Sequence, residues 1–357
     1  MHILIRSDAS TKIGSGHIMR CLTLADMLRT EGATVYFICR ELEGHLCDFV
    51  KAKGYECLRS TNSKQTFEQK KDAEETLRLI EWNGLKVDLI IVDHYQINEQ
   101  WEQIVRESIP KIMVIDDLAN RKHDCDVLLD QNYFKDFENR YDDLVPARCK
   151  KLLGLQYLLL RPEFYEENTV VVKKNKSIQD VLVFYGGSDP TNETMKVLDA
   201  LEYIDLSELT IHVVVGCSNA NRKIIEKRCQ DRGIHFYVQI DYLAQLMKKA
   251  DLALGAGGVT MWERMTLGLP SIVTVVAENQ MASTEAAAEF GAVWNLGWHE
   301  NVKVSDLVDI INSTIENPED LKEMSKKART LLQADIKFKI HPVVEAIWDT
   351  EISSLSQ

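Results

Sequence analysis

Predicted strands and helices alternate along this chain, beginning with an apolar strand over residues 2–6 and an amphipathic helix over residues 17–30. The runs Leu89–Val92 and Ile112–Ile115 are apolar throughout, which is typical of strands covered on both faces of a parallel sheet. The first half is therefore predicted to be a doubly wound α/β domain. Its expected strands lie over residues 2–6, 34–39, 88–92 and 111–115, and its expected helices over residues 17–30, 43–53, 65–82 and 98–108.

The alternation of strands and helices starts again at residue 180, after a charged stretch that is the best candidate for a linker. Two similar α/β domains are therefore expected, over residues 1–168 and 177–335, with a linker over residues 169–176. The last segment, residues 336–357, contains a short amphipathic helix that could fold back onto the first domain. The strands expected in the second half lie over residues 180–185, 210–215, 235–238, 252–254 and 271–275.

The chain has 357 residues, of which 45% are hydrophobic and 27% charged, and its net charge is −13. This composition is typical of a soluble globular protein, and the negative charge argues against nucleic acid or an anionic membrane as a partner. No apolar run approaches the length of a membrane span, so we expect no membrane insertion. The eight cysteines include no C-x-x-C pair and mostly occupy predicted core elements, as Cys21, Cys39 and Cys217 do. We therefore expect a reduced, cytoplasmic protein, and we expect it to be a monomer.

A loop containing Gly14 and Gly16 joins the first strand to the first helix, and His17 follows at the start of that helix. Glycine lets the backbone approach a ligand closely, and the first turn of a helix offers free N–H groups and a positive dipole end, so this segment fits an anion-binding site. The same positive end disfavours the imidazolium form of His17, so its ring could act as a neutral base. A solvated histidine at a helix start is the alternative, and position 19 is Met where the dinucleotide fingerprint has its third glycine.

Polar side chains follow several strands of the first half at the points where those strands end. Arg6 and Asp8 come after the first strand, the Asp-His-Tyr segment 93–95 after the third, and Asp116 with Asp117 after the fourth. Ligands of doubly wound sheets bind beyond these carboxyl ends, so the convergence indicates a site. For Asp116 and Asp117 we favour a different role, the capping of a following helix.

A second glycine-rich segment, Gly255–Glu263, leads into a predicted helix. Its glycines can cup an anion, Thr260 can add a hydroxyl, and Glu263 can accept two hydrogen bonds from a diol such as ribose. A capping box between Thr260 and Glu263 fits the spacing equally well. Asn279 and Gln280 follow the next strand at the same edge, where their amides could bond a sugar or cap the next helix.

The segments Gly255–Glu263, Gly268–Pro270 and Asn279–Gln280 resemble the nucleotide-sugar motif of the peptidoglycan N-acetylglucosaminyltransferases. Those proteins have two Rossmann-like domains facing across a cleft, the GT-B fold. The first half resembles a narrower group, the UDP-2,4-diacetamido-2,4,6-trideoxy-β-L-altropyranose hydrolases of pseudaminic acid biosynthesis. The segments that carry this second resemblance are 6–10, 13–20, 37–40, 93–95 and 115–117.

The resemblance implies a UDP-sugar hydrolase that cleaves the bond at the anomeric carbon with inversion, without a metal or another cofactor. Its expected partner is the UDP-activated diacetamido sugar. The resemblance assigns an essential histidine to His17 and an active-site tyrosine to Tyr95. For UDP it implies ribose on Glu263, uracil against the backbone near Ile240, and the diphosphate on the turn formed by Gly257, Gly258, Val259 and Thr260.

The chemistry of these residues agrees with that reaction. UDP is a good leaving group, so the sugar carbon needs no strong acid, but the diphosphate charge must be stabilised and a water activated on the opposite face. We expect His17 to activate the water, which is worth roughly 10²–10⁴-fold. We expect Asp8 to orient its ring, and Tyr95 to bond either the water or an acetamido group. The other residues expected at the substrate are Arg6, Gly14 and Gly16. An inverting glycosyltransferase of the same fold and a non-catalytic sugar-nucleotide binding protein are the alternatives.

Overall fold

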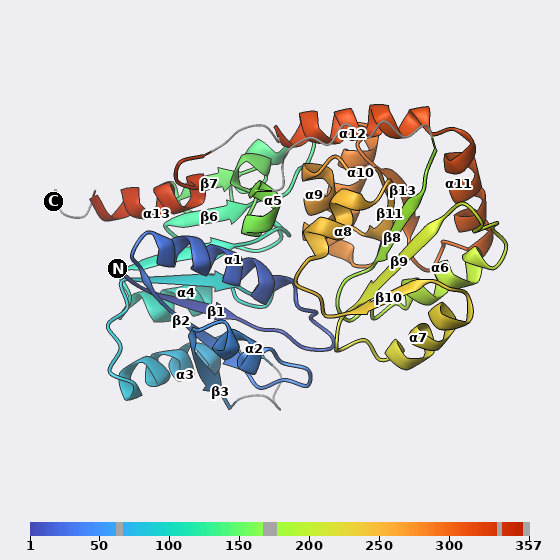
Figure 1. The fold of residues 1–357 in the computed structure, drawn as a ribbon. Coiled ribbons are helices and arrows are strands. Elements are labelled where there is room, and N and C mark those ends of the chain that lie inside the picture. Colours follow the sequence, from blue (N-terminus) through green and yellow to red (C-terminus); the bar gives the residue numbers. More distant parts are fainter. Residues whose placement is uncertain (62–66, 167–176, 334–337, 353–357) are drawn as a thin grey trace. The chain divides into compact units, whose positions relative to one another are not determined.

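The computed structural model describes residues 1–61, 67–166, 177–333 and 338–352 (Figure 1). The chain divides into two compact units, one formed by residues 1–159 and 337–357 and the other by residues 160–336. The first segment of the first unit ends at Leu159, whereas the boundary was expected at residue 168. The linker predicted over residues 169–176 lies outside the described residues.

The first unit contains a parallel sheet with strand order β3-β2-β1-β4-β5-β6-β7. Its direction of winding changes between β1 and β4, which are neighbours in the sheet although two strands separate them in sequence. The strands are β1 (His2–Ser7), β2 (Thr34–Arg40), β3 (Glu56–Ser60), β4 (Leu89–Asp93), β5 (Lys111–Ile115), β6 (Val127–Asp130) and β7 (Lys150–Leu153).

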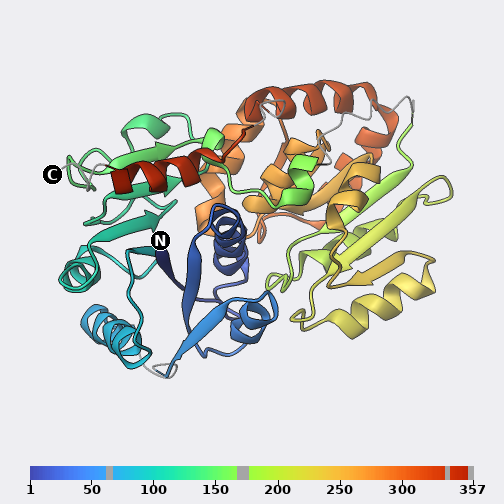
Figure 2. The same cartoon turned by 60° about the vertical axis from the view of Figure 1, so that its left-hand side comes forward.

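Helices cover both faces of this sheet, because alternate strand residues point to opposite sides. Ile3 and Ile5 pack into one core, whereas Leu4 packs into the other. The first core is covered by α1 (Gly16–Thr30), α2 (Cys47–Ala52) and α13 (Pro342–Ile352), and the second by α3 (Gln69–Trp82) and α4 (Glu99–Arg106) (Figure 2).

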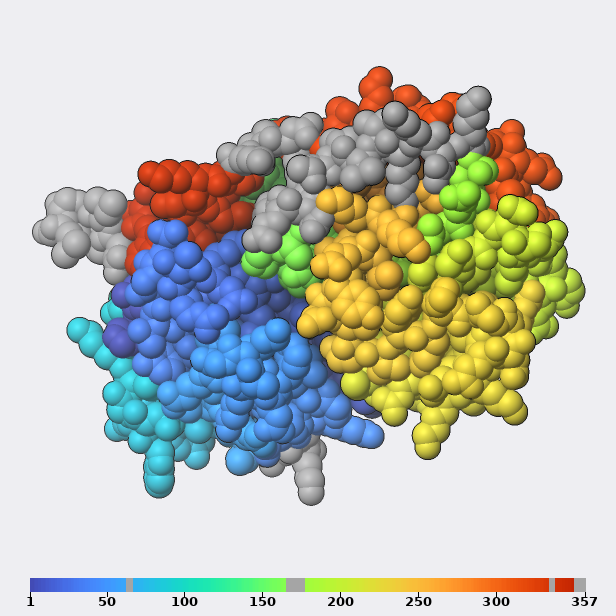
Figure 3. Space-filling view, in the orientation of Figure 1, coloured from blue at the N-terminus to red at the C-terminus, as the bar shows by residue number. Residues whose placement is uncertain are grey.

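The C-terminal helix α13 packs on the first unit. Val343, Val344 and Ile347 are buried in the same core as α1, and His341 lies with its Nε2 3.2 Å from the carbonyl oxygen of Leu158. Figure 3 shows the red surface of α13 lying against the blue surface of the first elements of the chain. A segment more than 300 residues from the N-terminus therefore completes the core around the first helix.

The second unit contains a parallel sheet with strand order β10-β9-β8-β11-β12-β13, and its winding changes between β8 and β11. Helices α6, α7 and α11 cover one of its faces. The strands are β8 (Asp180–Phe184), β9 (Thr210–Val215), β10 (His235–Val238), β11 (Leu252–Ala256), β12 (Ser271–Val275) and β13 (Trp294–Trp298). The helices are α5 (Pro162–Glu166), α6 (Glu193–Leu201), α7 (Arg222–Asp231), α8 (Leu243–Lys249), α9 (Val259–Thr266), α10 (Met281–Glu289), α11 (Val304–Glu316) and α12 (Glu319–Leu332).

The sequence prediction misses the strands β3, β6, β7 and β13. Of these, β3, β7 and β13 lie at the edge of a sheet. An edge strand has one strand neighbour only, and its sequence need not be an apolar run. The cysteines are mostly buried as predicted, but Cys217, which follows β9, is exposed, contrary to the prediction. Among the helices of the described residues, none has the length and the apolar character that crossing a membrane requires.

Candidate functional site

The change of winding between β1 and β4 brings together the start of α1 and the end of β4, and this is where ligands bind in doubly wound sheets. His17 lies in the first turn of α1 and is nearly buried. Its Nδ1 lies 2.5 Å from Oδ1 of Asp93, the last residue of β4. This distance assigns the Nδ1 proton to the bond with the carboxylate, which leaves Nε2 with the lone pair that can accept a proton.

Arg20, one turn further along α1, holds the Asp93 carboxylate from its other side. Arg20 Nε lies 2.6 Å from Asp93 Oδ2 and Arg20 Nη2 lies 2.7 Å from Asp93 Oδ1. Burial alone would raise the pKa of Asp93, but Arg20 and His17 outweigh burial and hold that pKa well below its usual range. Asp93 is therefore ionised, and it can fix the orientation of the His17 ring and stabilise an imidazolium.

Asp8 does not have the role expected from the sequence. Its carboxylate is bound by Arg6 Nη1 at 2.7 Å, by Arg40 Nε at 2.6 Å and by His94 Nε2 at 3.0 Å. The ring of His17 is oriented by Asp93 instead, so the expectation that Asp8 orients it is wrong.

The expectation that Arg6 contacts substrate is also wrong. Arg6 is fully buried, and its guanidinium is shared between Asp8 and Asp72. Because β1 is an interior strand, a side chain at its fifth residue is enclosed by the sheet and its covering helices. Arg6 therefore supports the end of the strand and is not accessible to a ligand.

Tyr95 lies beside His17, as expected for two residues of one site. The two rings meet edge to face, with their centroids 4.5 Å apart. Burial, reinforced by the Asp117 carboxylate, raises the pKa of Tyr95 above its ordinary value. Its hydroxyl is therefore protonated at neutral pH and is able to donate a hydrogen bond.

Asp116 and Asp117 do not cap a helix, because no helix lies between β5 and β6. Asp116 accepts a hydrogen bond from the backbone N–H of Ala119 in a turn, and Asp117 Oδ2 pairs with Arg20 Nη1 at 3.1 Å. The prediction of helix capping is therefore wrong for both residues. Asp117 instead belongs to the charged surroundings of His17, because it shares Arg20 with Asp93.

The loop before α1 contains Gly14 and Gly16, which differ in what the protein requires of them. Gly14 has a φ of 81°, which favours glycine, and its N–H donates to the Ser10 carbonyl at 2.8 Å. At Gly16 a Cβ would meet no heavy atom of the described residues within 4 Å. Gly14 therefore shapes the turn through its backbone conformation, and both positions face open space among the described residues.

The glycine turn of the second unit lies between β11 and α9, at the change of winding of that sheet. Gly258 has a φ of 75° and is the residue directly before α9. A Cβ on Gly257 would lie 3.1 Å from the Cβ of Gln280. Gln280 therefore lies against this turn, with its Oε1 accepting a hydrogen bond from Val276 N at 3.1 Å. Asn279 lies beside it in the 3-10 turn Glu278–Gln280, and Ile240 follows β10 with a half-buried side chain.

Glu263 does not form the capping box that its spacing from Thr260 allows. Thr260 lies inside the first turn of α9, and the Glu263 Oε1 accepts a hydrogen bond from Arg161 Nε at 2.9 Å. Its other oxygen, Oε2, is buried without a hydrogen-bond partner among the described residues. Burial raises the pKa of Glu263, and the Arg161 guanidinium opposes this shift. One carboxylate oxygen is thus fixed and the other is available to a hydroxyl donor.

Two arginines near this turn were not expected from the sequence. Arg161 holds Glu263, and Arg264 lies beneath the glycine turn, where its Nη2 donates to the Ala256 carbonyl at 2.7 Å and its Nε to Ser271 Oγ at 3.0 Å. Burial lowers the pKa of Arg264 to about 10, so it remains charged at neutral pH. The sequence did contain a signal for Arg264. It follows Thr260 by four residues in α9, and this spacing places both residues on one face of the helix.

The fold first defines the class of protein. Residues 181–340 match the glycosyltransferase family 28 C-terminal domain. The solved structure of MurG from Acinetobacter baumannii superposes on 98% of this chain and 99% of its own, with a TM-score of 0.65 at 15% sequence identity. The predicted fold class, α/β with two Rossmann-like domains of the GT-B type, is confirmed.

The sequence comparisons then identify relatives. The chain is 29% identical over 294 residues to the UDP-2,4-diacetamido-2,4,6-trideoxy-beta-L-altropyranose hydrolase of Campylobacter jejuni, covering 82% of this chain and 97% of that protein. It is 27% identical over 289 residues to the uncharacterized protein MJ1062 of Methanocaldococcus jannaschii, covering 79% of this chain but only 56% of that protein. The resemblance found from the motifs is confirmed by the similarity to the Campylobacter jejuni protein.

Proposed function

We propose that this protein hydrolyses UDP-2,4-diacetamido-2,4,6-trideoxy-β-L-altropyranose at its anomeric carbon, with inversion, to UDP and the free sugar. The observation that carries the proposal is the His17–Asp93 pair at the β1/β4 edge, which leaves Nε2 of an oriented histidine as a proton acceptor. The similarity to the Campylobacter jejuni hydrolase supports the choice of sugar.

In the proposed reaction, His17 Nε2 removes a proton from water while the water oxygen forms a bond to C1 of the sugar. The bond between C1 and the β-phosphate oxygen breaks, and its electron pair leaves with UDP. Because UDP is a good leaving group, no protonated side chain is needed at that oxygen. Asp93 stabilises the imidazolium that forms on His17. Tyr95 donates a hydrogen bond to the water or to an acetamido group of the sugar.

The second unit supplies the groups that bind UDP. Glu263 Oε2 is buried and available, which suits a ribose hydroxyl. The N–H groups at the start of α9, from Val259 and Thr260, suit the diphosphate, and the Gly257–Gly258 turn allows the phosphates to approach the backbone. The buried charge of Arg264 beneath this turn favours an anion above it. Uracil is proposed to lie against the backbone near Ile240, and the amides of Asn279 and Gln280 to bond the sugar.

The proposal is tested by measuring UDP release from the UDP-activated sugar in buffer without any acceptor and with a chelator present. We expect steady turnover, with a product that NMR identifies as the inverted anomer. His17→Ala should abolish this turnover. The control His235→Ala, which removes an exposed histidine on β10, should leave it unchanged. UDP release that requires an added acceptor would favour the inverting glycosyltransferase to which the family 28 match points. Binding of UDP without any turnover would favour a binding protein.

A further inference from the structure

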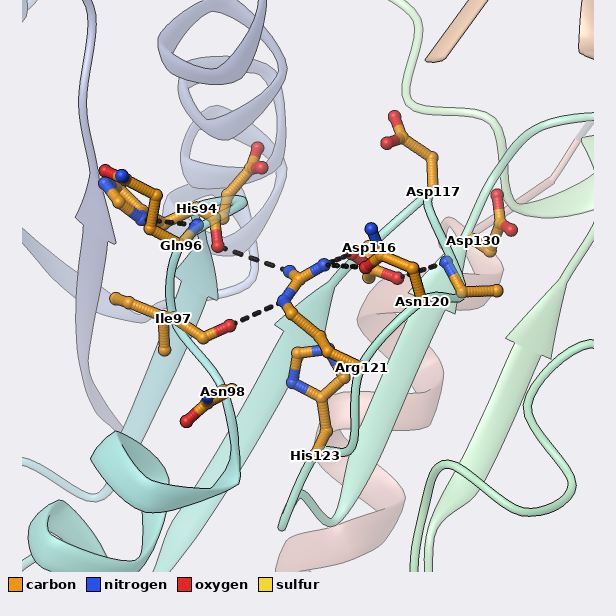
Figure 4. Close-up of polar contacts among 12 residues, drawn as sticks. His94, Gln96, Ile97, Asn98, Asp116, Asp117, Asn120, Arg121, His123 and Asp130 are labelled. Carbon is orange, nitrogen blue, oxygen red and sulfur yellow. Dashed lines mark hydrogen bonds and ion pairs between the residues drawn. The ribbon is translucent and has the colours of Figure 1, made fainter. Parts of the chain in front are cut away.

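Arg121 connects the segment that carries Tyr95 to the end of a neighbouring strand (Figure 4). It lies between β5 and β6, and its guanidinium donates from Nε to the carbonyl oxygen of Ile97 at 2.7 Å and from Nη2 to that of His94 at 3.3 Å. Its remaining nitrogen, Nη1, lies 2.7 Å from Asp116 Oδ1. Nη1 also donates to Asn120 Oδ1 at 3.1 Å. The guanidinium thus contacts two backbone carbonyls of one segment and, in the other, the Asp116 carboxylate and the side-chain amide of Asn120.

The two carbonyls lie at the two ends of a tight turn. The N–H of Ile97 donates to the carbonyl oxygen of His94 at 3.2 Å, which closes a four-residue turn with Tyr95 at its second position. Arg121 therefore binds the peptide group that enters Tyr95 and the peptide group that leaves the turn. The backbone of Tyr95 lies in neither a strand nor a helix, so sheet hydrogen bonds do not fix it.

The other end of this connection is rigid. Asp116 is fully buried directly after β5, and its Oδ2 accepts hydrogen bonds from the backbone N–H of Ala119 at 2.9 Å and from the Tyr141 hydroxyl at 3.0 Å. A planar guanidinium can form an ion pair with the carboxylate and donate to both carbonyls together, whereas a lysine ammonium on a flexible stem cannot match that geometry.

We propose that Arg121 is a positioning residue that fixes the 94–97 turn and thereby holds Tyr95 edge-on against His17. The inference rests on the proposed function, in which Tyr95 donates a hydrogen bond during the reaction. Arg121 acts through Tyr95 in this account, and its loss affects the chemical step more than the binding of UDP, because the proposed UDP groups belong to the second unit.

The test is a double-mutant cycle on the full-length protein, using Arg121→Ala, Tyr95→Phe and the combination. We expect Arg121→Ala to lower kcat about tenfold while the dissociation constant for UDP changes less than twofold. The double variant should be no slower than Tyr95→Phe by more than about twofold, because the hydroxyl that Arg121 positions is already absent. Arg121→Lys should recover part of kcat. Arg148→Ala, which removes exposed ion pairs to Asp124 and Asp126 near the same connection, serves as the matched control.

A second readout does not depend on turnover. Amide hydrogen exchange over residues 94–98 should become about tenfold faster in Arg121→Ala, should be accelerated less in Arg121→Lys, and should be unchanged in Arg148→Ala. Unchanged exchange of this turn, or losses of kcat that multiply in the double variant, would overturn the positioning role. If wild-type protein shows no hydrolysis in water, the proposed function fails, and the exchange measurement still decides whether Arg121 fixes the turn. Should Arg121→Ala not fold, Arg121→Lys takes its place in the cycle.

Discussion

Replacing Asp93 by asparagine is the change that most directly separates orientation of His17 from the overall charge of the site. The substitution keeps the size of the side chain but removes the carboxylate that binds His17 at 2.5 Å and Arg20 at 2.6 and 2.7 Å. The asparagine amide can donate to Nδ1, which would place the ring proton on Nε2, the atom that must accept a proton from water. We therefore expect Asp93→Asn to eliminate general-base catalysis while the histidine remains present.

The size of this effect follows from the role of the pair. General-base catalysis contributes roughly 10²–10⁴-fold, so kcat should fall by about that factor, which corresponds to about 3–5 kcal/mol in the activation free energy. Breaking a buried ion pair costs about 3–5 kcal/mol of folding stability. Arg20 keeps Asp117 at 3.1 Å, so the loss of stability should lie near the lower end of that range.

The assay compares Asp93→Asn with Asp8→Asn, because both remove a buried carboxylate that binds arginine. Acceptor-free kcat, the dissociation constant for UDP by calorimetry and the free energy of unfolding in urea are measured for each variant. Both should be destabilised, but only Asp93→Asn should lose more than about 100-fold in kcat with UDP binding intact. A kcat for Asp93→Asn within threefold of wild type, or a larger loss in Asp8→Asn, would refute the assignment of Asp93 as the residue that orients His17.

Three further outcomes are expected. Glu263→Gln should weaken UDP binding about tenfold in calorimetry, because it removes a charged acceptor for ribose, and an unchanged affinity would exclude that contact. Arg6→Met should lower the free energy of unfolding in urea by about 3–5 kcal/mol, because two buried carboxylates lose their cation. Weaker UDP binding at unchanged stability would instead show that Arg6 contacts the ligand. Burial raises the pKa of Asp130 to about 7 although Arg140 opposes the shift. The stabilisation that protonated Asp130 contributes is therefore fully present below its unfolded pKa of about 3.9, and it is lost as the pH rises through 7. Asp130→Asn should flatten the pH dependence of the urea midpoint between about pH 4 and 8, and an unaltered slope would contradict the shift.

Interior strands such as β4 and β5 could be predicted because their sequences report burial directly. Leu89–Val92 and Ile112–Ile115 are covered on both faces, and such segments are apolar at every position. The position of His17 was also predictable, since a glycine loop between a strand and a helix places the first turn of the helix at the carboxyl edge of the sheet. The glycine spacing and the polar residues at the ends of the strands therefore located the candidate site in the first unit.

The pairing of side chains within that site could not be predicted. Asp93 is separated from His17 by 76 residues, and the sequence analysis named Asp8, which is nearer in sequence, as its partner. The choice depends on the register of β4 beside β1, which sets which carboxylate faces α1. The spacing of Thr260 and Glu263 was likewise compatible with a local capping box, but the tertiary contact from Arg161 decides the orientation of Glu263.

The central claim is that water activated by His17 attacks the anomeric carbon and not the phosphorus of the UDP-sugar. It is tested most directly by running the reaction in water enriched in oxygen-18 and locating the label by mass spectrometry. The account predicts that the label enters the C1 hydroxyl of the released sugar and that UDP contains none. Label in the β-phosphate of UDP would contradict it.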